Sequence, residues 1–89
     1  MKYHVVQKEL DRRFTGGRQF MYCLDFFGQD KGKHFCEVRN WFWATFGPSS
    51  ELIFYVDSDQ VWAWITDSYR TRIYIRSDKE LEWYKLRWE

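Results

Sequence analysis

The pattern of apolar and polar positions first predicts a β-hairpin. Two runs rich in strand-forming residues, 2–14 and 18–27, flank a glycine pair at 16–17. Glycine readily takes the positive φ angles of a tight turn, so the pair predicts a loop between two antiparallel strands. With this pair as the loop, Lys8 lies opposite Asp25. From Lys8 onward the first run could instead form a helical turn.

A helix is predicted over residues 31–46. Its apolar positions recur at intervals of three or four residues, which places them on one helical face. They are Phe35, Val38, Phe42 and Phe46. Asp30 is a candidate N-cap, and the glycine and proline at 47–48 end the segment, because glycine suits the C-terminal cap and proline cannot continue a helix.

From Glu51 the spacing changes to a period of two, which predicts three antiparallel strands within residues 51–76. The strands are expected at 52–56, 61–66 and 69–76. One face receives Ile53, Tyr55, Trp62, Trp64, Ile73 and Ile75. The other face receives Leu52, Phe54, Val56, Val61, Ala63 and Ile65, followed by Arg70, Arg72, Tyr74 and Arg76.

A second helix is predicted over residues 78–88. Ser77 and Glu80 have the spacing of a capping box, in which the serine side chain accepts from the Glu80 amide. The apolar positions of this helix that share a face are Leu81, Tyr84 and Trp88. The complete order is ββαβββα. It predicts one α+β domain over residues 1–89, with a largely antiparallel sheet and both helices packed mainly on one face.

Two helices can cover one face of such a sheet, so an apolar surface should remain on the other. The face with Tyr55 and Trp62 is the better filled and is expected under the helices. The opposite face, with Phe54, Ala63 and Ile65, then needs a cover. The N-terminal hairpin, a second copy of the chain or a target protein could provide it.

Aromatic residues make up 22% of the chain: eight Phe, six Trp and six Tyr. Rings bury a large area at a low cost in side-chain entropy, so they can stabilise a short chain. In 89 residues, however, so many rings are hard to bury completely. Exposed Trp and Tyr side chains are the residue types that anchor protein interfaces.

Charge and hydropathy exclude several classes of protein. The formal net charge is only +1, so no strong field attracts nucleic acid or an anionic membrane. The first residues reach charged positions too early for a signal peptide, and no apolar run approaches the ~20 residues that cross a membrane. Cys23 and Cys36 are expected to be reduced, buried thiols of a cytoplasmic protein.

The candidate metal ligands do not have metal-site spacing. They are His4, Cys23, His34 and Cys36. Structural zinc sites use close pairs such as Cys-x2-Cys, which this sequence lacks. A phosphate-binding loop and a nucleophile motif are also absent from the sequence. The sequence therefore predicts no metal, no cofactor and no enzyme activity.

Alternation along the last predicted strand places Arg70, Arg72, Tyr74 and Arg76 on one face, here called the arginine stripe. Basic groups interleaved with a ring suit single-stranded nucleic acid or a protein interface, and they also occur on solvated strands. The low net charge favours protein over nucleic acid. The predicted partner-binding residues are Arg70, Arg72, Tyr74, Arg76, Trp62, Trp64 and Phe54.

Three segments of the C-terminal half form a distinctive combination. Residues 41–48 are aromatic and end in Gly-Pro, 73–80 pass from a strand to an acidic helix start, and 84–88 read aromatic-x-Leu-Arg-Trp. In these segments the chain resembles small proteins of tailed bacteriophages. The resemblance implies a phage origin and the host cytoplasm as compartment, and it brings no active site.

From this resemblance we expect a small non-enzymatic protein that binds a host protein and inhibits or redirects it. Bacterial defence nucleases, CRISPR effectors and RNA polymerase are the expected kinds of target. One alternative is a virion structural or accessory protein that self-associates, for example as a homodimer. The other is a single-stranded nucleic-acid-binding module that uses the arginine stripe.

Overall fold

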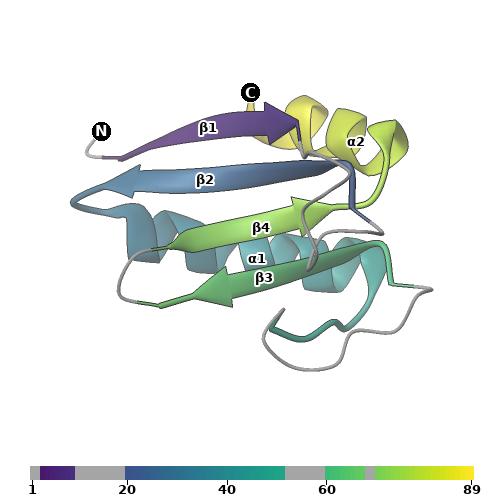
Figure 1. Cartoon of the computed structure of the whole chain (residues 1–89), viewed down its shortest axis with the longest axis horizontal. Coiled ribbons are helices and arrows are strands. Elements are labelled where there is room, and N and C mark those ends of the chain that lie inside the picture. The colour runs from purple at the N-terminus through teal and green to yellow at the C-terminus, as the bar shows by residue number, and fades with distance from the viewer. Residues whose placement is uncertain (1–2, 10–19, 52–59, 68–69) are drawn as a thin grey trace.

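The computed structural model describes residues 3–9, 20–51, 60–67 and 70–89 (Figure 1). Its elements are β1 (Tyr3–Glu9), β2 (Tyr22–Gly28), α1 (Lys31–Phe46), β3 (Trp62–Thr66), β4 (Thr71–Ile75) and α2 (Asp78–Trp88). This is an α+β fold, as the sequence predicts. Both helices have the predicted bounds. The strand expected at 52–56 lies outside the described residues.

The four strands form one antiparallel sheet in the order β1-β2-β4-β3 (Figure 1). The predicted hairpin between the last two strands is confirmed, with Trp62 opposite Ile75 and Trp64 opposite Ile73. β4 then returns to the centre of the sheet and pairs with β2, so that Leu24 lies opposite Ile73. This long-range pairing joins the two halves of the chain.

The register of the first strand pair differs from the prediction. Lys8 lies opposite Cys23, and Val6 lies opposite Asp25, a shift of two residues from the register that a loop at 16–17 would give. A shift of two keeps every side chain on its predicted face, because side chains alternate along a strand. Lys8 on β1 and Asp25 on β2 therefore still share a face of the sheet, as diagonal neighbours across the two strands.

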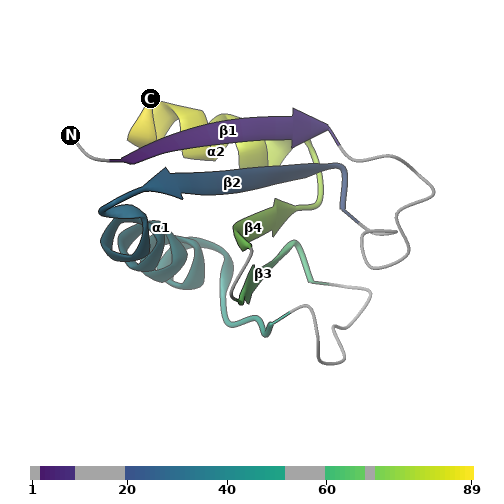
Figure 2. The same cartoon turned by 60° about the vertical axis from the view of Figure 1, so that its left-hand side comes forward.

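The main core lies between the sheet and the two helices, which cover the same face of the sheet (Figures 1 and 2). α1 buries Phe35, Val38 and Phe42, as its spacing predicts. Leu81 and Tyr84 of α2 join them, and Trp62, Ile73 and Ile75 face them from the sheet. The predicted division of β3 and β4 into two faces is therefore confirmed for the residues described.

A second, smaller core lies on the sheet face away from the helices, here called the far face. It consists of Phe20, Cys23, Ala63, Ile65 and Tyr74, all buried. Ala63 and Ile65 were expected to need a cover, for which the chain itself was one of three alternatives; they are buried within this chain. Val61 also differs from the prediction: it precedes β3, where strand alternation does not apply, and it packs against the main core.

The helix ends follow the sequence signals only in part. Gly47 takes a φ of 94°, and its N–H donates to the carbonyl of Trp43, which ends α1 as predicted. Neither Asp30 nor Ser77 makes a side-chain cap to its helix. The Ser77 hydroxyl instead donates to the Glu80 carboxylate over 2.7 Å, so the predicted capping box is wrong in its geometry.

Cys36 is exposed on α1, which corrects the expectation of two buried thiols. Its neighbour Phe35 and the following Val38 occupy the buried side of the helix. Successive helix positions are rotated by about 100°, so Cys36 points away from that side. Cys23 is buried on the far face, as expected.

Candidate protein-binding surface

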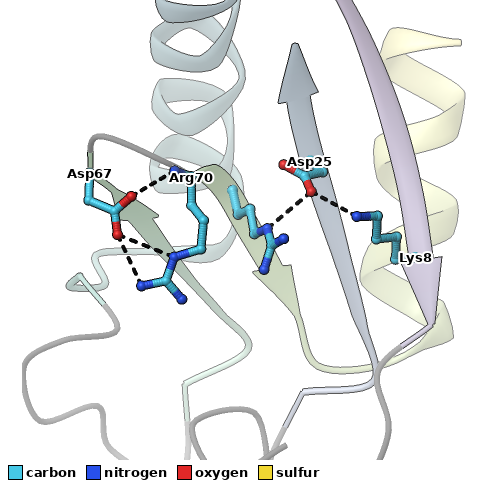
Figure 3. Close-up of polar contacts among 5 residues, drawn as sticks. Lys8, Asp25, Asp67 and Arg70 are labelled. Carbon is cyan, nitrogen blue, oxygen red and sulfur yellow. Dashed lines mark hydrogen bonds and ion pairs between the residues drawn. The ribbon is translucent and has the colours of Figure 1, made fainter.

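Most residues of the arginine stripe make contacts within the chain. Asp25 is buried, and one of its carboxylate oxygens accepts from Lys8 Nζ at 3.0 Å and from Arg72 Nε at 3.1 Å (Figure 3). Three strands thus contribute to one ionic cluster on the far face. Burial by itself lowers the pKa of Arg72, but Tyr74 and Asp25 outweigh that effect and raise it overall. Arg72 is therefore held as a charged structural group.

Arg70 and Tyr74 of the stripe also make contacts within the chain. Arg70 donates from Nε and Nη2 to Asp67 Oδ2 at 3.2 and 3.0 Å (Figure 3). Tyr74 is fully buried and packs against Phe20, with ring centroids 6.1 Å apart. Arg76 is exposed beyond the end of β4. The stripe therefore does not form a continuous free basic surface.

The two tryptophans among the predicted site residues lie on the opposite face from the stripe. Trp62 is buried under α1, and its indole N–H donates to the carbonyl of Gly47 at 2.9 Å. This bond fixes the end of α1 on β3. Trp64 is half-buried at the margin of the same face. Phe54 lies outside the described residues.

A groove runs between α1 and β3, here called the α1–β3 groove, with a volume of about 520 Å³. It is lined by Arg39, Asn40, Trp43, Ala44 and Trp64. Trp43 leaves 46% of its surface exposed, and its ring lies 6.3 Å from that of Trp64 at an interplanar angle of 53°. The Arg39 guanidinium lies over the Trp64 ring at 5.4 Å.

A second groove of about 350 Å³, here called the α1–α2 groove, lies between the two helices. Its lining residues are Trp41, Trp83, Leu86 and Arg87. Trp83 is 51% exposed, and Leu86 is 86% exposed. Arg87 lies over the Trp88 ring at 4.4 Å. Exposed tryptophan and arginine thus occur together on both sides of α1.

Sequence reasoning overlooked these exposed residues, although the helical pattern contains a signal for two of them. On α1, Trp43 follows the buried Phe42 and is therefore rotated off the apolar face. On α2, Leu86 lies on the side opposite Leu81 and Tyr84, which are buried. A large apolar residue off the apolar face of an amphipathic helix predicts an exposed contact residue.

Two buried titratable groups, His34 and Cys23, lie on opposite sides of the sheet. His34 is buried between Phe26 and Trp88, with ring centroids 5.7 and 5.5 Å away, and burial lowers its pKa while Glu37 partly opposes this. Burial raises the pKa of the Cys23 thiol. Within the described ranges, no three His, Cys, Asp or Glu side chains gather to hold a metal ion.

Neither described helix combines the length and the apolarity that a membrane crossing requires. No protein-family model, no curated protein and no solved structure matches the chain.

Proposed function

We propose that this chain is a small non-enzymatic protein that acts by binding another protein. In keeping with the phage resemblance of its C-terminal half, we propose that it is a phage product whose target is a host protein that it inhibits or redirects. The observation that supports binding most directly is the exposure of Trp43, Trp83 and Leu86 on the helix layer.

These side chains are exposed although the core beneath them is complete. Phe42, Trp62 and Tyr84 already fill the space between α1, α2 and the sheet. Trp43 and Trp83 lie outside that core and contact it only at the edge. A single exposed apolar residue is ordinary in a monomer, but tryptophans lining two grooves on one layer are typical of a binding surface.

The geometry favours a protein partner over single-stranded nucleic acid. Nucleic-acid binding needs cationic groups free to meet phosphates, with rings that bases can stack on. Arg70 and Arg72 instead face Asp67 and Asp25, and Tyr74 is buried. The exposed rings lie on the other face of the sheet, next to one arginine in each groove.

Affinity capture with matched variants tests the proposal. Tagged wild-type chain is incubated with bacterial lysate beside the double variant Trp43→Ser, Trp83→Ser. Met21→Ser is the control, because Met21 is 45% exposed but lines neither groove. We expect the wild type and the control to retain the same protein and the double variant to lose it.

Circular dichroism must first show that all three chains are folded. Light scattering of the purified chain tests the alternative that the same surface joins two copies. If the folded double variant retains the same proteins as the wild type, the helix layer is not the binding surface. If the wild-type chain captures no protein from the lysate and is also a strict monomer, the proposed function is wrong.

A further inference from the structure

We propose that the α1–β3 groove binds a segment of the partner protein in which an apolar side chain lies next to an Asp or Glu, whose carboxylate pairs with Arg39. This inference rests on the proposed function and specifies its partner chemistry. The groove supplies an aromatic wall, one fixed cation and one amide, and these three features select the ligand.

The aromatic wall is formed by rings that pack on one another. Trp64 stacks on Trp62, with ring centroids 5.4 Å apart and an interplanar angle of 29°. Trp62 is itself fixed by its hydrogen bond to Gly47. Trp43 completes the wall at 6.3 Å from Trp64. A wall that is already ordered loses little entropy on binding, which favours affinity for an apolar anchor.

Within the part of the chain that the structure describes, Arg39 lies at the groove without an acidic partner. Its guanidinium lies 5.4 Å from the Trp64 ring centroid and 5.9 Å from that of Phe35. The positions three and four residues away on α1 hold Phe35, Cys36, Phe42 and Trp43, so no neighbouring turn provides a carboxylate. None of the ion pairs among the described residues involves Arg39.

A purely apolar partner would remove water from the Arg39 guanidinium without replacing the hydrogen bonds that the water made. Covering an unpaired charge is costly, whereas a carboxylate on the partner offsets the loss with charge-assisted hydrogen bonds. Among the described residues that line the groove, Arg39 is the only charged one. One cation matches a single carboxylate, while a nucleic-acid backbone needs several cations.

The remaining lining residues suit an extended peptide. Asn40 is exposed and offers both an amide donor and a carbonyl acceptor, which can bond to the backbone of a bound segment. Ala44 is small, so it leaves space between the aromatic wall and the outer side of α1. A peptide lying along α1 can therefore place its apolar side chain against Trp43 and its acid at Arg39.

Selection from a randomised peptide library tests this inference on the whole chain. We expect the selected sequences to carry an Asp or Glu beside an aromatic residue or leucine. For a synthetic peptide of the selected sequence, Arg39→Gln should weaken binding by about tenfold or more, because it leaves the peptide's acid unpaired. Replacing that acid by its amide should weaken binding similarly, and combining both changes should add little.

Lys33→Gln is the matched control, because Lys33 is an exposed cation of α1 that lines neither groove, and the variant should leave this binding unchanged. The inference is wrong if no peptide is selected, if the selected peptides lack an acid, or if folded Arg39→Gln binds them as well as the wild type. Lysate capture separates the two claims. Loss of the captured protein in the double tryptophan variant, with full capture by Arg39→Gln, would retain the proposed function and reject this ligand chemistry.

Discussion

Replacing Asp25 by Asn should destabilise the fold mainly through Arg72 and only slightly through Lys8. Both cations contact the same carboxylate oxygen at nearly equal distances, 3.1 Å for Arg72 and 3.0 Å for Lys8. Distance therefore does not separate them. Their exposure to solvent distinguishes the two ion pairs, because the Arg72 side chain is 23% exposed and the Lys8 side chain is 46% exposed.

The magnitudes follow from this difference in exposure. A hydrogen bond to a charged group in a partly buried site contributes about 2 kcal/mol, which we assign to the Arg72 contact. An exposed ion pair contributes about 0.5 kcal/mol, which we assign to the Lys8 contact. Asp25→Asn keeps the shape of the side chain but removes its charge, so the loss should be about 2.5 kcal/mol.

Double-mutant cycles with Arg72→Gln and Lys8→Gln measure the two couplings separately. Unfolding in urea, followed by tryptophan fluorescence, gives the free energy of each variant. Repeating the cycles in 1 M salt should reduce the Lys8 coupling more, since salt screens exposed charges most. A Lys8 coupling equal to or larger than the Arg72 coupling would refute the reasoning that burial sets the strength of this cluster.

Three further changes test other parts of the fold. Ser77→Ala removes the donor to the buried Glu80 carboxylate and should cost about 1–2 kcal/mol in urea unfolding, whereas Ser77→Thr should cost less. With iodoacetamide at pH 8, mass spectrometry should find one adduct, on the exposed Cys36, and a second on Cys23 only after denaturation; rapid double labelling of the native chain would contradict this. Because burial holds the pKa of His34 below its usual 6.5, the unfolded chain binds a proton at His34 more readily than the folded chain does. The free energy of unfolding should therefore fall as pH drops from 7.5 to 5.5, and fall less in His34→Gln.

The sequence by itself determined the two helices and the hairpin of β3 and β4. These elements depend on local signals: the three-to-four-residue spacing within α1, the glycine that ends it, and the period of two along β3 and β4. Local periodicity also assigned Trp62 and Ile73 to the face that meets the helices. A period of two fixes which side chains share a face wherever the strand is placed.

Only the tertiary structure decided which strand lies beside which, and therefore which charges meet. The pairing of β2 with β4 places Arg72 opposite Asp25, residues that no local pattern relates, and this converts a predicted binding stripe into an internal ionic cluster. The same packing decides which rings remain outside the core. Trp62 and Trp43 are both tryptophans, yet one is buried beneath α1 and the other lines a groove, because burial depends on what the rest of the chain brings to each ring.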